Sequence, residues 1–582
     1  MAFITDTRIL RLHLPPEGFR LDNGEILRQI DVAYETCGTL NEARDNVVFI
    51  CHALTGDAHV AGEHDDPRKT RGWWDNMVRP GGGIDTNRYF VICANVLGGC
   101  MGTTGPSSIN PETGVPYGSR FPEISVRDIV EVHRLLLKQL GFEHVYALVG
   151  GSFGGMQAME WAVRHPDDAE KIAIIASGDS LTTQALAFDV VGRTAILNDP
   201  HFDGGDYYGH IHPDLGLSLA RKLAHITYIS NHLMEQKFAR RRREVTPEDG
   251  QADAKEIFEI ESYLNHQGEK FINRFDANSY LRITAAMDNF YLRNGFDSLA
   301  DAFSRIQAKV LVVALSGDWL FLPEQSETLA KAFHAAKCRV SHFCLEAPAG
   351  HDAFLINIEE LQDVVKGFLV RQPIRTPTVR ETDDLRDYKE LVSLIPEGTR
   401  TVLDLACGEG DLLNFISEKR SDIDCTGLDM VTDCARVVLA SGHNAIRANI
   451  DDGLKGIPDN SYDCVILSES LQVMRRPDIV LKELLRIAPV GIISFPNFGM
   501  WKVRAEIAFL GRMPVTKRLP WQWYNTPNIH LCTIKDFIQL CKDRQIKFDR
   551  IRYMSTLLLS RFFNFIGAKN LGASRVLVRI RR

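Results

Sequence analysis

Apolar and polar residues alternate along the chain in two blocks, and each block predicts a largely parallel sheet covered by helices. In the first block, short apolar runs are separated by longer amphipathic stretches such as 125–140 and 324–335. Alternation of strands and helices is typical of α/β domains. We therefore expect strands at the apolar runs 47–51, 89–94, 145–149, 309–315 and 339–345.

The strand pattern disappears between about residues 185 and 300. That segment is long, helical in its periodicity and rich in aromatic and charged residues, so we expect a helical lid inserted over the sheet. It contains the run Arg240–Arg243 followed by an acidic stretch. We interpret this run as a solvated helix end or loop rather than a binding patch.

The composition changes at residues 371–385, where prolines and charges replace apolar residues. Such a stretch predicts a linker between domains. Alternation then restarts at Thr401, so we expect one domain at 1–370 and a second at 386–582. The basic end at 575–582 has a strand pattern, which favours a last sheet strand over a nucleic-acid site.

Bulk composition narrows the function. The chain has 582 residues, 45% hydrophobic and 24% charged, with a net charge of −8, which gives no reason to expect a nucleic-acid or membrane partner. Its 12 cysteines include no C-x-x-C pair, so we expect reduced thiols and no metal site. No signal-peptide pattern and no membrane-spanning run occur in the sequence, and we expect a cytoplasmic protein.

Residues 150–154 read Gly-Gly-Ser-Phe-Gly and fit the G-x-S-x-G pattern of a nucleophile elbow, with Ser152 at its centre. An apolar run precedes the motif and an Ala- and Met-rich helical run follows it. The glycines permit a sharp turn that exposes the serine at a helix N-terminus. The pattern and its context together predict a serine nucleophile.

A serine nucleophile needs a base and an acid. In folds that carry this elbow, the three residues occur along the chain in the order Ser, then Asp or Glu, then His. Asp318 and His351 each come just after a predicted strand, where active sites of open α/β sheets assemble. We expect the oxyanion hole to use the backbone N–H groups of Phe153 and Leu54.

The first domain closely resembles homoserine O-acetyltransferase, an enzyme of methionine biosynthesis with the α/β-hydrolase fold. The stretches that carry the resemblance are 94–106, 258–264 and 271–280, and it covers essentially residues 5–370. The resemblance implies Ser152, Asp318 and His351 as the catalytic triad of a ping-pong transfer from acetyl-CoA to L-homoserine. It implies no cofactor for this step and a homodimer built through the lid.

The resemblance also implies an acceptor site. Arg221 matches the family arginine that grips the amino-acid carboxylate, and a guanidinium suits that task because it forms a planar, bidentate fork. Asp352 matches the position that binds the substrate, through its ammonium group. Tyr228 either lines the same pocket or packs within the lid.

The acyl donor is indicated by one position. Relatives that use succinyl-CoA tend to carry an arginine two residues after the triad aspartate, whereas this chain has Leu320. A leucine leaves a buried succinyl carboxylate unpaired, so we favour acetyl-CoA. Succinyl-CoA as donor, serine as acceptor and plain ester hydrolysis are the alternatives.

The second domain begins with a strand and a glycine turn that resemble motif I of class I S-adenosylmethionine-dependent methyltransferases, a Rossmann-type fold. Asp404, Gly408, Gly410 and Asp429 are the S-adenosylmethionine-binding residues that this resemblance implies. Asn449 stands where such enzymes often have an acid that contacts adenine, which weakens the case for the cofactor.

The domain as a whole resembles the MetW-type protein of methionine biosynthesis. The stretches 463–472, 494–499 and 526–533 carry this second resemblance. Methyl transfer, ligand sensing and a regulatory or stabilising role are all open for this domain.

Overall fold

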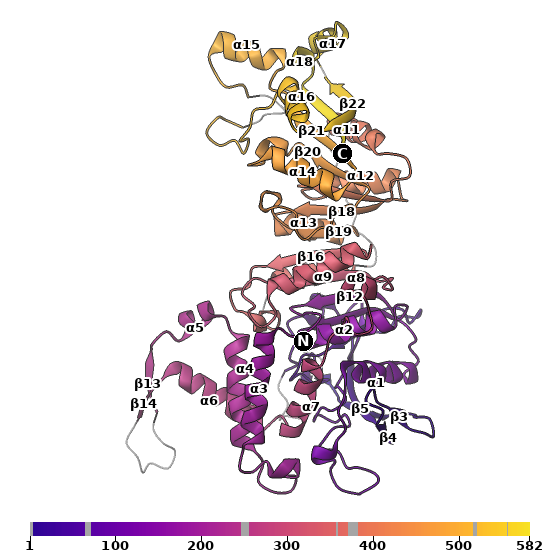
Figure 1. Cartoon of the computed structure of the whole chain (residues 1–582), viewed down its shortest axis with the longest axis vertical. Coiled ribbons are helices and arrows are strands. Elements are labelled where there is room, and N and C mark those ends of the chain that lie inside the picture. The colour runs from indigo at the N-terminus through magenta and orange to yellow at the C-terminus, as the bar shows by residue number, and fades with distance from the viewer. Residues whose placement is uncertain are drawn as a thin grey trace. The chain divides into compact units, whose positions relative to one another are not determined.

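The computed structural model describes residues 4–64, 71–245, 255–356, 359–370, 382–515, 521–555 and 557–582 (Figure 1). The chain divides into two compact units, Met1–Leu369 and Val370–Arg582. Residues 371–381 of the expected linker lie outside the described part of the chain. Its last residues, 382–385, form the start of helix α11 (Thr382–Leu394).

The N-terminal unit is built on one mixed sheet in which β5 pairs antiparallel with β2 and β10, and the remaining neighbours are parallel. Every residue of the central strands β6 and β11 is buried, as expected for strands that are covered on both faces. Across the sheet the strands are β2 (Arg8–Arg11), β5 (Asp31–Cys37), β10 (Phe90–Ala94), β6 (Val47–Cys51), β11 (Val145–Gly151), β12 (Ala169–Ile175), β15 (Lys309–Leu315) and β16 (Val340–Leu345).

Helices cover this sheet, and α2 lies along β11 and β12 while α9 lies along β15 and β16. Ser125 caps α1, because its side chain accepts the backbone N–H of Asp128 and completes a capping box. The covering helices are α1 (Val126–Gln139), α2 (Phe153–Arg164), α8 (Leu299–Phe303), α9 (Pro323–Ala335) and α10 (Glu359–Leu369). Short strand pairs outside the sheet are β1 (Ile4–Thr5) with β7 (Glu63–His64), β3 (Phe19–Arg20) with β4 (Ile26–Leu27), and β8 (Val78–Arg79) with β9 (Ile84–Asp85).

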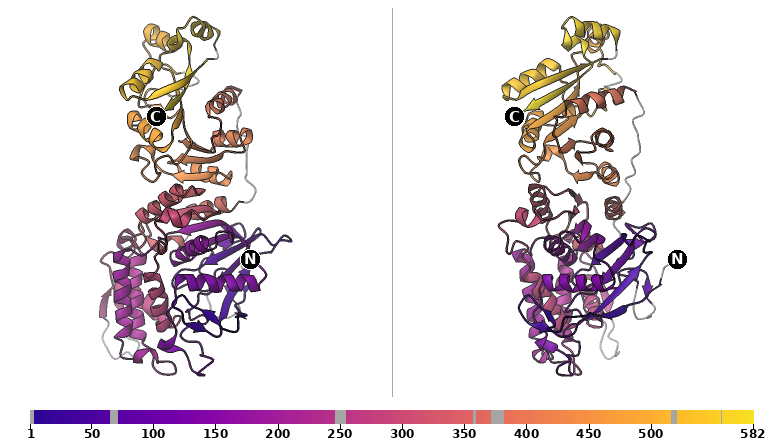
Figure 2. Two further views of the ribbon diagram at one scale, coloured as in Figure 1. Left: turned by 45° about the vertical axis from the view of Figure 1, so that its right-hand side comes forward. Right: turned by 90° about the vertical axis from the view of Figure 1, so that its right-hand side faces the viewer.

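The lid contains the helices α3 (Thr183–Leu197), α4 (Asp214–Tyr228), α5 (Asn231–Lys237), α6 (Glu259–Ile272) and α7 (Ala277–Asp288). Figure 2 shows α3 and α4 side by side, and α4 also packs on α6. The lid is not purely helical, because β13 (Arg242–Val245) and β14 (Lys255–Phe258) pair as an antiparallel ribbon. Expecting no strand in this segment was therefore wrong.

The arginine run at 240–243 lies partly in this ribbon rather than in a helix end or loop. Arg241 is paired with Glu259, and Arg242 is paired with Glu256 on the opposite strand. The Arg242 guanidinium also lies over the Phe258 ring, 4.4 Å from its centroid. Carboxylates and an aromatic face thus compensate these charges within the lid.

The C-terminal unit has its own sheet in the order β19, β18, β17, β20, β21, β23, β22, in which β23 is antiparallel to both of its neighbours. In chain order this is 3-2-1-4-5-7-6, so the order reverses between β17 and β20, where open α/β sheets bind ligands. The strands are β17 (Thr401–Leu405), β18 (Asp424–Asp429), β19 (Asn444–Arg447), β20 (Cys464–Ser468), β21 (Val490–Pro496), β22 (Lys547–Met554) and β23 (Arg575–Arg581).

The expected strand at the basic end is confirmed, since β23 is buried except at its last residue. The helices that accompany this sheet are α11, α12 (Asp411–Lys419), α13 (Thr432–Ala440), α14 (Pro477–Ile487), α15 (Trp501–Leu510), α16 (Ile534–Asp543), α17 (Leu558–Phe565) and α18 (Lys569–Gly572). Across both units, every described helix is too short or too polar to cross a membrane.

Candidate functional site

Ser152 stands in the turn between β11 and α2, with a backbone φ of 56° that non-glycine residues rarely adopt. Such strain is typical of a nucleophile elbow. The glycines of the motif are required by space. A Cβ on Gly150 would come within 2.1 Å of the Gly154 carbonyl oxygen, and one on Gly154 within 2.0 Å of the Cys51 carbonyl oxygen.

The three predicted catalytic residues meet in a continuous chain of hydrogen bonds. His351 Nε2 lies 2.9 Å from Ser152 Oγ, and His351 Nδ1 lies 2.7 Å from Asp318 Oδ2. The other oxygen of Asp318 accepts the backbone N–H groups of Leu320 and Phe321, which fix the carboxylate. This arrangement orients the imidazole so that Nε2 can take the serine proton.

Burial and charge act in opposite directions on His351. Burial of the ring lowers its pKa, but the charge and hydrogen bond of Asp318, with help from Asp352, raise the pKa above the ordinary value for histidine. The ring therefore gains a proton readily when Ser152 reacts. At low pH it is already protonated and cannot act as the base.

The backbone N–H groups of Leu54 and Phe153 make no hydrogen bond to another described residue. Phe153 is the first residue of α2, where helix N–H groups lack intrahelical partners. Leu54 lines the same cavity as Ser152. Both groups are thus available to an oxyanion beside the serine.

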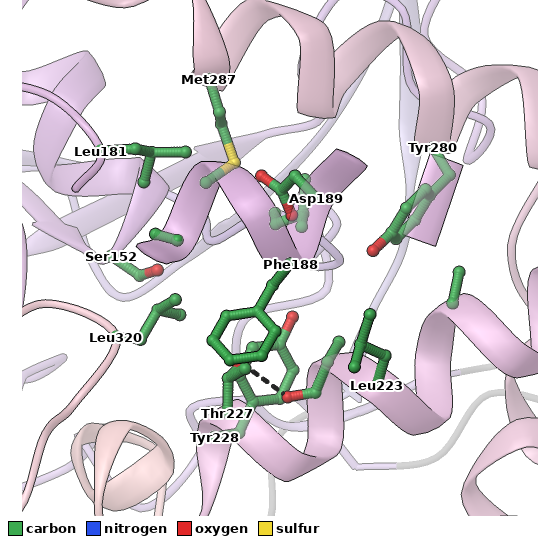
Figure 3. Close-up of a pocket in the computed structure, with 14 residues that line it drawn as sticks. Ser152, Leu181, Phe188, Asp189, Leu223, Thr227, Tyr228, Tyr280, Met287 and Leu320 are labelled. Atoms are coloured by element: carbon green, nitrogen blue, oxygen red, sulfur yellow. Dashed lines mark hydrogen bonds between the residues drawn. The ribbon is translucent and has the colours of Figure 1, made fainter. Parts of the chain in front are cut away.

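A cavity extends from Ser152 into the lid, between α3, α4 and α7 (Figure 3). Its wall is mainly aliphatic and aromatic and includes, besides Ser152 and Leu54, two further residues that the sequence singled out, Leu320 and Tyr228. The described lining consists of Leu54, Ser152, Leu181, Ala185, Phe188, Asp189, Ala220, Leu223, Ala224, Thr227, Tyr228, Tyr280, Met287 and Leu320.

Arg221 and Tyr228 both lie on α4, and the guanidinium of Arg221 lies 5.5 Å from the centroid of the Tyr228 ring and 4.7 Å from that of Phe271. Arg221 donates a hydrogen bond to Thr55 Oγ1 at 3.2 Å, and no described carboxylate is ion-paired with it. A free guanidinium at this depth is suited to a carboxylate ligand.

Asp352 follows His351 directly and accepts no hydrogen bond from another described side chain. Burial raises its pKa, and the nearby charges of His351 and Arg221 lower it in part. The ring centroids of Tyr228 and His351 lie 6.0 Å apart. The structure therefore gathers Arg221, Asp352 and Tyr228 near His351.

Three residues near the site were missed from sequence. The hydroxyl of Tyr263 lies 3.2 Å from Nδ1 of His225, and burial with the charge of Asp352 raises the pKa of Tyr263 to about 12. Asp189 lines the cavity. Tyr263 lies in the stretch 258–264 that carries the family resemblance, but nothing in that stretch marked it as a site residue. His225 and Asp189 belong to no motif with a fixed spacing.

The glycine turn of the C-terminal unit is held by the side chain of Asp429. Asp429 accepts the backbone N–H groups of Gly408 and Val431, each at 2.9 Å. A Cβ on Gly408 would meet no atom within 4 Å, whereas one on Gly410 would meet Val438 at 2.8 Å. Gly410 thus packs the turn, and Gly408 faces room for a ligand.

Asp404 is buried beneath this turn, and its Oδ1 has no partner among the described residues. Burial and the charge of Asp429 raise the pKa of Asp404 to about 8. A positively charged ligand would satisfy both carboxylates, so these residues fit S-adenosylmethionine. Asn449 uses its side-chain oxygen to cap a local turn through the Asp451 N–H, which leaves it less available to a ligand.

Two family models match the chain. The model of the alpha/beta hydrolase fold matches residues 46–358, and the model described as methionine biosynthesis protein MetW matches residues 385–573. These matches confirm the predicted folds of both halves.

Curated relatives and a solved structure extend the match. The bifunctional methionine biosynthesis protein MetXA/MetW of Rhodopirellula baltica is 39% identical over 91% of this chain and 86% of that protein. Homoserine O-acetyltransferase of Methanohalophilus mahii is 47% identical over 61% of this chain and 71% of its own length. The crystal structure of homoserine O-acetyltransferase from Bacillus anthracis superposes with a TM-score of 0.58, at 30% identity, over 63% of this chain and 98% of that one.

The geometry predicts how Ser152 reacts with a serine-directed fluorophosphonate. Labelling should slow as the pH falls through the His351 pKa, with a midpoint above about 6.5, because Asp318 raises that pKa. In Asp318→Asn the midpoint should move to lower pH, since burial is then opposed only by the weaker effect of Asp352. Ser152→Ala is the control and should take no label at the elbow. A wild-type midpoint clearly below that of ordinary histidine would contradict this account.

Proposed function

Because the chain belongs to the family of bifunctional methionine biosynthesis proteins that join a homoserine O-acetyltransferase to a MetW domain, we propose that its N-terminal unit transfers an acetyl group from acetyl-CoA to the hydroxyl of L-homoserine. The products are O-acetyl-L-homoserine and CoA. The observation that carries the proposal is the chain of hydrogen bonds from Ser152 through His351 to Asp318, beside a lidded cavity.

In the first half-reaction, His351 Nε2 takes the Ser152 proton while Oγ attacks the thioester carbonyl carbon. The N–H groups of Leu54 and Phe153 stabilise the oxyanion that forms. When it collapses, the carbon–sulfur bond breaks and the imidazolium gives its proton to the departing CoA sulfur. The acetyl group remains on Ser152 as an ester.

In the second half-reaction, homoserine replaces CoA and His351 takes the proton of its hydroxyl. The hydroxyl oxygen attacks the acetyl ester, and collapse of the second oxyanion returns a proton to Ser152 Oγ. Water competes for the same ester. The aliphatic and aromatic cavity wall disfavours water, while the lid holds the homoserine hydroxyl in position.

The acceptor is held at both of its charged groups. Arg221 binds the homoserine carboxylate, since its guanidinium has no carboxylate partner among the described residues. Asp352 binds the ammonium group beside His351, and Tyr228 lines the space between them. Serine carries the same two charges but is one methylene shorter, so its hydroxyl would fall short of the acetyl ester.

The donor is acetyl-CoA rather than succinyl-CoA. Leu320 lines the cavity next to Ser152 and offers no positive charge to a distal carboxylate. A succinyl carboxylate there would lose its hydration without gaining a partner.

The C-terminal unit binds S-adenosylmethionine and acts as an accessory or regulatory module. The glycine turn, Asp429 and the unpaired Asp404 support a ligand that carries positive charge. Methyl transfer by this unit is the alternative.

The assembly is a homodimer formed through the lid, in the cytoplasm. Helices α3 and α4 expose aliphatic side chains that a partner surface would cover, namely Val190, Val191, Leu197, Leu215, Leu219 and Ile226. The twelve cysteines, all of which lie in described parts of the chain, form no disulfide, as is usual in a reducing compartment.

The function predicts that sustained CoA release from acetyl-CoA depends on homoserine. Arg221→Lys should raise the KM for homoserine by about tenfold or more, because a bidentate contact is lost, and leave the KM for acetyl-CoA nearly unchanged. Steady-state assays of free thiol, with serine as a comparison acceptor, make this measurement. CoA release at the same rate with and without homoserine would indicate a hydrolase instead.

Replacing Leu320 by arginine should change the donor. In Leu320→Arg the ratio of kcat/KM for acetyl-CoA to that for succinyl-CoA should fall by about tenfold or more, because the guanidinium pairs with the succinyl carboxylate. Leu320→Met, which lengthens the side chain without charge, is the matched control and should keep the wild-type ratio. An unchanged ratio in Leu320→Arg would count against the donor assignment.

Calorimetry on the full-length chain tests the C-terminal site. S-adenosylmethionine should bind the wild type, and Asp429→Ala should weaken binding because the glycine turn loses the carboxylate that orders it. Asp433→Ala, an exposed position four residues later, should bind as the wild type does. Absence of binding heat at high ligand concentration would eliminate S-adenosylmethionine.

A further inference from the structure

Asp189 places a carboxyl group in the wall of the cavity that Ser152 shares (Figure 3). It lies on α3, and in the view of Figure 3 it stands between Ser152 and Tyr280. The described lining contains no lysine, arginine or histidine. Asp189 is thus the one carboxyl among the lining side chains, and the reactions of Ser152 make no use of it.

The guanidinium nearest to Asp189 along α3 already has a carboxylate partner. Arg193, one turn further along α3, forms an ion pair with Asp288 at the end of α7. Burial, together with the charge of Asp288 and a hydrogen bond to it, raises the pKa of Asp189 to about 8, although the charge of Arg193 acts in the opposite direction. From α4, Arg221 and Tyr228 face the same region, as does Tyr280 from α7.

We infer that the ionised carboxylate of Asp189 excludes acyl groups that carry a carboxylate, and so restricts the donor to a short, uncharged acyl chain. The inference rests on the proposed role of Ser152 as acyl carrier. A succinyl group on Ser152 would bring a third carboxyl to Asp189 and Asp288, whose nearby guanidinium, Arg193, is already paired with Asp288. Arg221 faces the same region from α4 but is not among the described lining residues of the cavity. The new carboxylate would lose its hydration and meet repulsion instead of a partner.

This role differs from that of Leu320. Leu320 merely fails to attract a carboxylate, whereas Asp189 repels one when it is ionised. A protonated Asp189 repels less, so rejection of a succinyl group should strengthen as the pH rises through about 8. The dependence on pH separates an electrostatic role from a role in packing.

Single-turnover acylation tests the inference without the acceptor. The rate of CoA release is measured with acetyl-CoA and with succinyl-CoA from about pH 7 to about pH 9, and the rate with acetyl-CoA is divided by the rate with succinyl-CoA. His351 acts on both donors alike, so its titration cancels in the ratio. In the wild type the ratio should rise with pH. In Asp189→Asn it should be lower by about tenfold at the alkaline end and should no longer depend on pH.

Two further variants serve as controls. Asp189→Glu should keep the pH-dependent ratio because it keeps the charge, and Asp214→Asn, an exposed carboxylate on the same lid, should behave as the wild type does. If Asp189→Asn does not fold, the wild-type profile still decides. If the ratio does not change with pH in the wild type, or if a folded Asp189→Asn has the wild-type ratio, the inference about Asp189 is overturned and the proposed function is not affected. A wild type that prefers succinyl-CoA, or that is not acylated, contradicts the proposed function instead.

Discussion

The buried pair between Asp318 and His351 is the interaction on which the account of the N-terminal unit depends. The imidazole is only 3% exposed and the carboxylate is fully buried, with 2.7 Å between Nδ1 and Oδ2. Burial alone would keep the ring neutral and weakly basic. The fixed carboxylate reverses this, so that the ring can accept a proton from a serine that lies on a separate loop.

The sheet makes this pair possible. Asp318 follows β15, His351 follows β16 and Ser152 follows β11, so parallel strands deliver all three side chains to one edge. The strained turn at Ser152 requires glycine at positions 150 and 154, because a Cβ at either position would clash with a backbone carbonyl oxygen. Strand order, backbone strain and a buried charge pair therefore act together to build one nucleophile.

Five strands of the N-terminal sheet and the triad could be predicted from the sequence because each rests on a local pattern, whereas β2, β5 and β12 of the same sheet were not predicted. Apolar runs define the strands, and the glycine motif and the order of Asp318 and His351 indicate the catalytic chemistry. The ribbon at Arg242–Val245 was missed because its polar, exposed strand has no apolar alternation. Asp189 was missed because it reaches the site only when helices distant in sequence pack together, which no local pattern encodes. Tyr263 lies in a stretch that resembles the family, but the packing of α6 on α4 that brings it near the site is not visible in the sequence.

The central claim is that Ser152 carries the acetyl group between the two half-reactions. The full-length protein is mixed with acetyl-CoA in the absence of homoserine, quenched rapidly in acid, digested and examined by peptide mass spectrometry. We expect the mass increment of one acetyl group on the peptide that contains Ser152, and its loss, with formation of O-acetyl-L-homoserine, when homoserine is added before the quench. Transfer to homoserine without any acetyl group on Ser152 would contradict the account.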